Sequence, residues 1–208
     1  GRNADLQAGG AITAAVGTSV TSVNSDARLA AGGVLTIDRI GVGSGRVSLI
    51  GSSVVEAGSD AAAEVAAAGL RIVATGAIGS EANRIEVQVG TLTARAAAGG
   101  MWFEEADALR IGDVTVAVQR VGAAGTVTAL TDAVQSDLIT TGGNGDIAVT
   151  TLNGDIDLLD GTAPADGRSI SADGSGRVLL DVNGAGAVLD VTTDDLVQTG
   201  PVTIPSDL

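Results

Sequence analysis

The sequence predicts an all-β chain folded as a β-solenoid with coils of roughly 20 residues. Three observations lead to this prediction. Aromatic residues make up only 1% of the 208 residues, whereas hydrophobic residues, mostly small or branched aliphatics, make up 45%. Glycine occurs 31 times and proline only 3 times, so the frequent turns are glycine turns. Short apolar runs separate them, and small aliphatic side chains suit a thin core of stacked strands.

Strand-like runs recur along the chain and often alternate between apolar and polar residues. The clearest runs cover residues 33–37, 46–50, 84–89, 113–118, 146–149 and 177–180. Apolar residues take every second position in these runs, which gives a strand one buried face. We therefore expect the runs to stack their apolar faces into one narrow column.

A corner rich in glycine or asparagine precedes several runs and is followed by one polar residue and an apolar strand. The motif GSGRV occurs at 43–47 and again at 174–178, and looser variants occur at 143–147, 153–156 and 184–188. The first buried residues after these corners recur at intervals of roughly 20 residues, as in the coils of a solenoid. The expected structural corners are Gly145, Gly154, Gly176 and Gly186.

The segment from residue 60 to residue 69 allows two interpretations. Its alanines favour a short helix, with Asp60 as the N-cap and Gly69 as the stop. A pair of small-residue strands within the stack is the other interpretation, and the flanking strand-like runs favour it slightly. The residues alone leave both open.

The composition excludes several classes of function. The net charge is −14 and all 11 basic residues are arginine, so nucleic acid and anionic membrane surfaces are unfavourable partners. The absence of Cys and His removes disulfides, thiolate metal sites, the commonest general base and the commonest zinc ligand. No apolar run reaches about 18 residues, so we expect no membrane insertion. Without lysine, the chain has no phosphate-binding P-loop.

The stretch 142–146, GGNGD, is close to the G-G-x-G-x-D loop that binds calcium in β-roll repeats. Its three glycines fit, but Asp146 stands one residue early and Ile147 takes the ligand position. We therefore expect a corner here and no cofactor. Clustered acids elsewhere are weak calcium candidates, namely Asp155, Asp157 and Asp160, with Asp194 and Asp195 further along.

A carbohydrate-active enzyme on the same fold is a competing hypothesis. Parallel β-helices include polysaccharide hydrolases, which need paired acids facing a groove, and Asp155 and Asp157 share one face of a strand. Such enzymes also use aromatic platforms together with Lys, Arg, His or Tyr, and of these four residue types Lys, His and Tyr are absent. We therefore predict no catalytic residues and expect the acids to form a solvated face.

One part of the chain resembles a known repeat. Residues 77–94 read AIGSEANRIEVQVGTLTA, and residues 98–112 read AGGMWFEEADALRIG. This pattern is similar to that of the filamentous-haemagglutinin-like adhesins and related giant bacterial surface proteins, and the stretches 146–161 and 174–191 look like their coils. The resemblance implies a right-handed parallel β-helix, export to the cell surface, adhesion or stalk-building, and no enzymatic role. Residues 1–208 would be one segment from the interior of a much longer repeat protein.

The residues of this pattern have physical roles in such a coil. Asn83 would stand at a corner, where its amide can satisfy backbone groups. Ile85, Val87 and Val89 would face inward. Trp102 is either an exposed ligand contact or part of a core plug, and we favour the structural role.

Three functions therefore compete. The first is a non-enzymatic structural and adhesive segment of an exported bacterial surface protein, with surface or matrix glycans and flanking repeats as partners. The second is a subunit of an extracellular filament or sheath, in which coils associate end to end between chains. The third is a β-helix enzyme acting on polysaccharides. We expect an extracellular location for all three.

Overall fold

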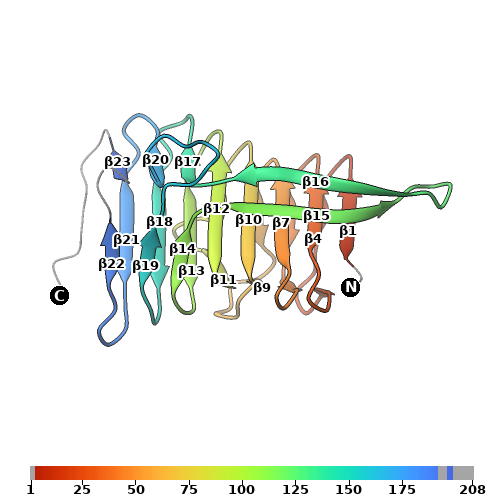
Figure 1. Ribbon diagram of the computed structural model, residues 1–208, viewed down its shortest axis with the longest axis horizontal. Coiled ribbons are helices and arrows are strands. Elements are labelled where there is room, and N and C mark those ends of the chain that lie inside the picture. Colours follow the sequence, from red (N-terminus) through yellow and green to blue (C-terminus); the bar gives the residue numbers. More distant parts are fainter. Residues whose placement is uncertain (1–2, 192–195, 199–208) are drawn as a thin grey trace.

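The computed structural model describes residues 3–191 and 196–198. The strands run across the long axis of the molecule and stack along it, from β1 at one end to β22 and β23 at the other (Figure 1). The described residues form strands and no helix, so the prediction of an all-β chain is confirmed. The described part accordingly contains no helix with the length and apolar character to cross a membrane.

The largest sheet has eleven strands, all paired in parallel. In later coils two short strands replace one long strand, because β12 pairs with β14 along one half and with β17 along the other. The strands of this sheet are β1 (Ala4–Ala8), β4 (Ala27–Ala31), β7 (Arg46–Gly51), β10 (Gly69–Ala74), β12 (Thr91–Ala96), β14 (Leu109–Ile111), β17 (Leu138–Thr140), β19 (Ile156–Leu158), β20 (Ile170–Ala172), β22 (Leu189–Val191) and β23 (Leu196–Gln198).

Two further parallel sheets complete the coils. The seven-stranded sheet holds β3 (Ser19–Thr21), β6 (Arg39–Gly41), β9 (Val65–Ala67), β11 (Ile85–Val89), β13 (Met101–Glu105), β18 (Ile147–Thr151) and β21 (Val178–Val182). The three-stranded sheet holds β2 (Ile12–Thr13), β5 (Leu35–Ile37) and β8 (Val54–Glu56). The chain visits these sheets in turn and then returns to the largest sheet, which is consistent with a β-solenoid.

The core is a narrow column built from residues in register. One row of the largest sheet runs through Leu29, Leu49, Ile72, Ala94 and Leu138, each at most 3% exposed. Each residue stacks on its equivalent in the next coil, about 4.8 Å away, so small aliphatic side chains fill the space. The predicted inward residues of β11 are buried as well, with Ile85 at 0% and Val87 and Val89 at 1% exposed.

The stacking distance along the sequence differs between the two halves of the molecule. Near the N-terminus, contacts between neighbouring coils join residues 20 to 23 positions apart, as for Asn24 with Ser44 and Ser52 with Thr75. Across the strap insertion between β14 and β17 the spacing is longer, as for Thr93 and Asp137, which are 44 positions apart. Beyond it, contacts join residues 31 to 33 positions apart, because a shorter insertion separates β19 from β20. Ile147 therefore pairs with Val178.

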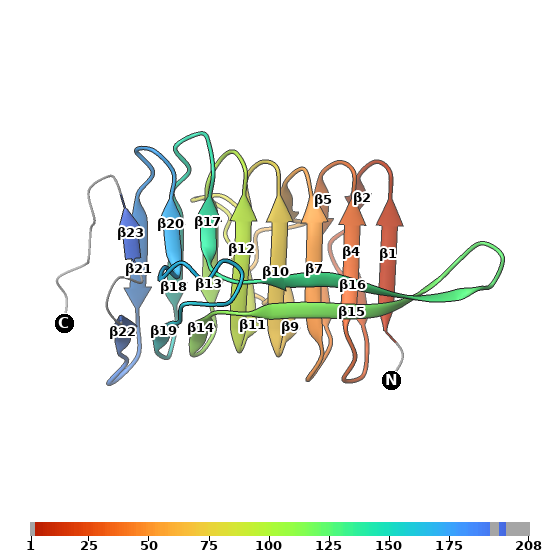
Figure 2. The ribbon, with the colours of Figure 1, turned by 45° about the horizontal axis from the view of Figure 1, so that its top comes forward.

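The first of these insertions is an antiparallel hairpin that the sequence did not predict. It consists of β15 (Val114–Val121) and β16 (Val127–Gln135), and we call it the strap. Figures 1 and 2 show it lying along the long axis, across β10, β7, β4 and β1, with its tip projecting past β1. The run 113–118 is thus a strand, but the expectation that it joins the common column is wrong.

The strap has its own small core and is fastened to the outer face of the sheet. Val114, Val116 and Val118 form a separate buried cluster, against which Leu130 packs. The fastening contacts are Arg28 Nε to the two carboxylate oxygens of Asp132 (2.9 and 3.1 Å), Arg120 Nε to Asp5 Oδ2 (2.6 Å) and Gln135 Nε2 to the Ile72 carbonyl (3.0 Å). The strap therefore connects strands that are far apart in the stack.

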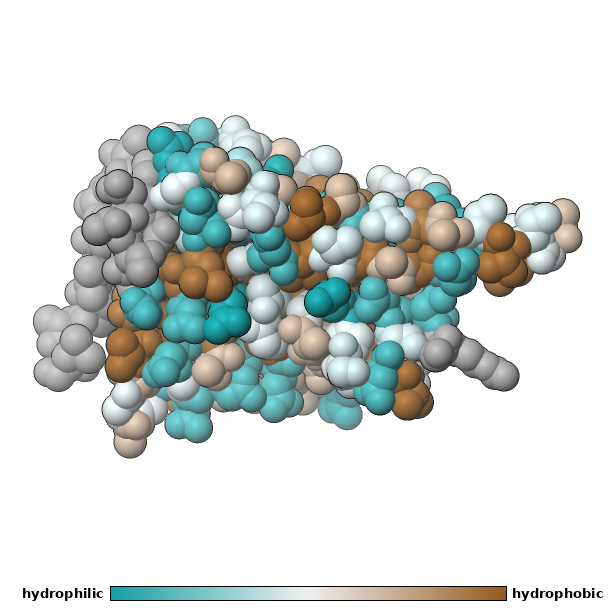
Figure 3. Space-filling model, in the orientation of Figure 1, coloured by the Kyte–Doolittle hydropathy of each residue, from teal (hydrophilic) through white to brown (hydrophobic). Residues whose placement is uncertain are grey.

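The projecting end of the strap is more apolar than an exposed loop usually is. Val121 is 70% and Val127 is 60% exposed there. Figure 3 shows hydrophobic side chains near this end and in separate patches along the strap, among hydrophilic ones. The strap therefore carries exposed apolar side chains beyond β1, at the N-terminal end of the stack.

The ambiguous segment between residues 60 and 69 contains no helix. Residues 60–64 form a loop, β9 covers Val65–Ala67, and Gly69 begins β10. Val65 is fully buried in the column, and β9 pairs in parallel with β6 and β11. Burial of a side chain in the stack decides the outcome here against the helix propensity of the alanines.

Candidate functional site

A hydrogen-bonded corner motif appears twice and explains the repeated GSGRV. In the N-terminal half, Asn24 Oδ1 accepts the N–H of Ser44 (3.1 Å) and Asp26 Oδ1 accepts that of Arg46 (2.9 Å). The second copy has Asn144 Oδ1 with Ser175 N (3.0 Å) and Asp146 Oδ1 with Arg177 N (2.7 Å). An N-x-D corner in one coil thus binds the G-S-G-R corner of the next. Asp146 is therefore used to join coils.

The four predicted corner glycines are required for two reasons. A Cβ on Gly145 would lie 1.9 Å from the Gly99 carbonyl oxygen, one on Gly176 would lie 2.3 Å from that of Gly145, and one on Gly154 would lie 2.5 Å from the backbone nitrogen of Ala108. These three positions need glycine because successive coils approach so closely. Gly154 (φ 150°) and Gly186 (φ 78°) also adopt backbone angles that favour glycine.

The weak calcium candidates do not come together. Asp155 Oδ1 accepts the N–H of Val188 (2.8 Å), and Asp157 pairs with Arg110 at 3.4 Å. Asp160 is exposed, and Asp194 and Asp195 lie outside the described residues. In the part of the chain that the structure describes, no one of these candidates belongs to a group of three acids close enough to share an ion.

Asn83 and Trp102 take positions in the coil that fit structural roles. Asn83 Nδ2 donates to the carbonyl of Gly58 (3.0 Å), which fastens its corner to the loop of the preceding coil. Trp102 is half-buried and lies between two fully buried neighbours, Met101 and Phe103, so it points away from the column.

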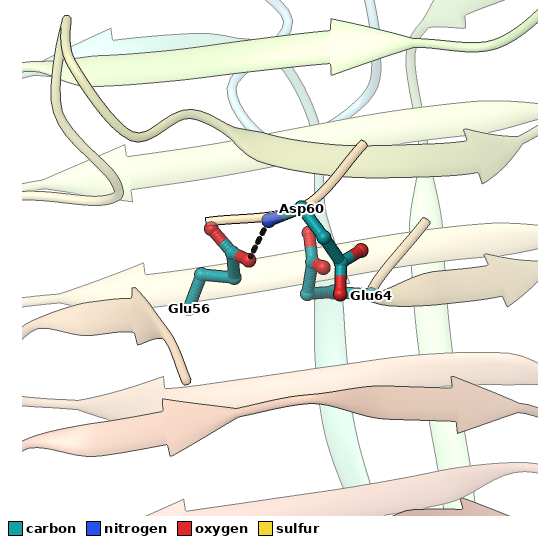
Figure 4. Close-up of side chains that lie close together, drawn as sticks. All are labelled: Glu56, Asp60 and Glu64. Atoms are coloured by element: carbon teal, nitrogen blue, oxygen red, sulfur yellow. Dashed lines mark hydrogen bonds between the residues drawn. The ribbon is translucent and has the colours of Figure 1, made fainter. Parts of the chain in front are cut away.

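Three other carboxylates do converge, and we call them the acid cluster: Glu56, Asp60 and Glu64 (Figure 4). One oxygen of each lies within 4.8 Å of the others. Glu56 is 8% and Glu64 is 2% exposed, whereas Asp60 is exposed. Glu56 Oε1 accepts the backbone N–H of Asp60 at 3.2 Å. Oxygen ligands at this spacing suit a hard divalent cation.

The strand register explains why acids gather at this place. Glu64 precedes Val65, which pairs with Val87, so Glu64 stands beside Glu86, and Glu86 pairs in turn with Glu104. Glu64 Oε2 accepts the backbone N–H of Glu86 at 2.8 Å. Burial and contact with Glu86 together raise the pKa of Glu64 to about 9, and burial also raises the pKa of Glu86. One proton is therefore held between these two groups near neutral pH.

Another buried glutamate, Glu105, lies within the column itself. Glu105 is 0% exposed and occupies the row of Val65 and Val87. Its carboxylate oxygens accept the N–H of Val89 at 3.0 and 3.2 Å and that of Asp107 at 3.3 Å. Burial nevertheless raises the pKa of Glu105 to about 8, because the hydrogen bonds do not offset the loss of water. This side chain is also protonated near neutral pH.

A groove opens where the two insertions flank the largest sheet, and we call it the strap groove. Its volume is about 500 Å³. Its floor comes from β10, β12 and β17, one wall from β16 and the other from the insertion between β19 and β20. The residues that line it include Arg71, Arg95, Val134, Ile139, Thr141 and Pro164.

The sequence contained signals for part of this geometry. The spacing of 22 residues between Glu64 and Glu86 is one coil length of the N-terminal half, so it predicts adjacent acids once the coil is known. The N-x-D partner of each GSGRV stands one coil earlier. Nothing in the sequence indicated that a hairpin lies along the stack, so the groove beside it, which Arg71 and Arg95 both line, was missed.

Comparison with known proteins adds no assignment. A scan against protein-family models, a search of curated proteins and a search of solved structures each found no match for this chain. What the chain does must therefore be inferred from its own residues and geometry.

Proposed function

We propose that the chain is a non-enzymatic structural and adhesive segment of a large exported bacterial surface protein. Its coils are right-handed and contain roughly 20 residues where no insertion interrupts them. The observation that carries the proposal is the continuous aliphatic column of parallel, in-register strands, fastened along one side by the strap. The resemblance of residues 77–112 to giant adhesin repeats supports the same function.

The positions of the acids favour a non-enzymatic role. A hydrolase on this fold needs a pair of acids at an open groove. In the described chain the acid cluster holds two buried carboxylates under the loop of residues 57–63, and Glu105 lies in the column. The strap groove is lined by arginine and apolar residues instead.

An adhesion assay tests this function. The segment, displayed on a bacterium that does not adhere, is expected to increase retention on surfaces coated with polysaccharide, and the purified segment is expected to leave polymer length unchanged. A display strain carrying an unrelated solenoid of similar length is the control. Shortening of any polymer would contradict the non-enzymatic assignment, and retention equal to the control would contradict the adhesive one.

A filament subunit, in which coils associate end to end between chains, is the second candidate. In the described residues β1 pairs only with β4. A cavity of about 340 Å³ opens there, lined by apolar residues that include Leu6, Ile12 and Val20. Leu6 is 37% exposed at this open end. Fibres in electron micrographs of the purified chain would favour this candidate, and a monomer at all concentrations would exclude it.

A further inference from the structure

The strap groove stands where two neighbouring coils of the described stack depart from the regular pattern. The strap is inserted between β14 and β17, and the next coil carries an insertion at the same position, between β19 and β20. Both insertions emerge on the outer side of the largest sheet, beside each other (Figure 2). In stacked repeats, insertions of this kind often form the binding face.

Two arginines at the floor of this groove have hydrogen-bond donors left to offer. Arg71 Nε donates to the carbonyl of Ala133 (3.2 Å), and Arg95 Nη2 donates to that of Ala163. Arg95 Nε is buried and has no hydrogen-bond partner in the described part of the chain. Neither arginine forms an ion pair within the described residues.

The positive charge at this floor is only partly compensated by nearby carboxylates. Burial lowers the pKa of Arg71; the carboxylate of Asp132 opposes this, and the charges of Arg95 and Arg28 lower the pKa further. Asp132 itself is held by Arg28 at 2.9 Å, so it does not neutralise the pair at the floor. In a chain with a net charge of −14, two adjacent arginines without a carboxylate partner form a local site for an anion.

We propose that the strap groove binds the carboxylate of a uronic-acid residue within an acidic polysaccharide. The planar guanidinium groups of Arg71 and Arg95 match the two oxygens of a carboxylate. Val134, Ile139 and Pro164 offer an apolar surface to the C–H face of the sugar ring. The volume of about 500 Å³ lies within the usual range for small-ligand sites.

The form of the groove favours a polymer over a free chain end. Val134 is 39% exposed and Thr141 is exposed, so the groove is open to solvent at its rim and admits an internal residue of a long chain. The carboxyl end of a peptide is usually captured by a nest of backbone N–H groups, whereas the free donors here are on side chains. This inference rests on the proposed adhesive function and gives it a ligand class.

Calorimetric titration of the whole chain with oligogalacturonate, at low salt, tests the site. Measurable binding is expected, whereas a neutral galactose oligomer of the same length is expected not to bind. Arg95→Gln and Arg71→Gln are each expected to weaken binding by about tenfold to a hundredfold. Arg46→Gln removes the same charge from the same sheet outside the groove, so its affinity is expected to stay within about twofold of the parent value.

A second variant keeps the test decisive if an arginine variant unfolds. Val134→Asp places a carboxylate on an exposed wall of the groove, where it contributes nothing to the column, and it is expected to abolish binding without changing the melting temperature. Binding that survives Val134→Asp, or that falls equally with Arg46→Gln, would overturn the site. Equal binding of the neutral oligomer, or equally strong binding of inorganic sulfate or of a peptide carboxylate, would overturn the uronate assignment. Adhesion without uronate binding would leave the proposed function standing and reject this inference alone.

Discussion

Raising the pH from about 5 to about 9 is expected to lower the free energy of unfolding by about 3 to 9 kcal/mol and the melting temperature by roughly 10 to 30 °C. Glu64 and Glu105 have pKa values near 9 and 8 in the folded chain, against an ordinary value of 4.5. The folded chain therefore binds more protons than the unfolded chain between these values. Their contribution to stability is complete below about pH 4.5 and is lost as the pH rises through about 8 to 9.

The composition makes this measurement unusually clear. The chain has no His, no Cys and no Tyr, and all of its basic residues are arginine, so apart from the α-amino group no ordinary side chain titrates between about pH 6 and pH 10. A change in stability within that range reports the buried acids. It is measured as the melting temperature followed by circular dichroism.

Matched variants assign the effect to individual groups. Glu105→Gln and Glu64→Gln each imitate the protonated side chain, so each is expected to flatten the pH profile, and the double variant is expected to flatten it most. Glu81→Gln is the control, because Glu81 is exposed. Stability that is constant or that rises between about pH 6 and pH 9 would contradict the burial of these acids.

Gly145→Val is expected to destabilise the chain by about 3 kcal/mol or more. The Cβ would lie 1.9 Å from the carbonyl oxygen of Gly99 in the preceding coil. The carbonyl oxygen of Gly145 in turn lies close to Gly176 in the next coil. The atoms that the new side chain would meet are backbone atoms of Gly99 and Gly100, so the spacing between the coils must change to make room. The free energy of unfolding from urea denaturation measures the effect.

Gly41→Ala is the control for this substitution. A Cβ at Gly41 would meet nothing within 4 Å, and its backbone angle does not require glycine. Its effect is expected to stay within about 0.5 kcal/mol. If Gly145→Val costs no more than Gly41→Ala, the coils do not approach each other as closely as described.

The regular part of the fold could be predicted from the sequence because it follows from local patterns. The alternation in residues 84–89 predicts a strand with Ile85 and Val87 inward, and that strand is β11. The repeated GSGRV predicts equivalent corners, and both copies have the same partners in the coil before them. Such features depend on the residues of one or two coils.

The strap and the sites near it depend on contacts between distant residues. The alternation of residues 113–118 is the same for a coil strand and for a hairpin lying over the sheet, so periodicity cannot separate them. What places the strap is a set of polar contacts such as Arg28 with Asp132, which are 104 residues apart. The acid cluster was missed for a related reason. Glu56 takes an inward position in the short strand β8, and the pattern of that strand does not show which acids of other segments lie beside it.

The most direct test of the stacked, in-register coils is an engineered disulfide, which is straightforward in a chain without cysteine. Ala66 and Gln88 are partners on β9 and β11, and both side chains face away from the column. Mild oxidation of the Ala66→Cys, Gln88→Cys variant is expected to form the cross-link in nearly all molecules, as measured by titration of free thiols. Ala66→Cys with Glu86→Cys is two residues out of register, which exceeds the reach of a disulfide, so its thiols are expected to stay free. Equal cross-linking of both pairs, or preference for the second pair, would contradict the parallel register on which the whole account depends.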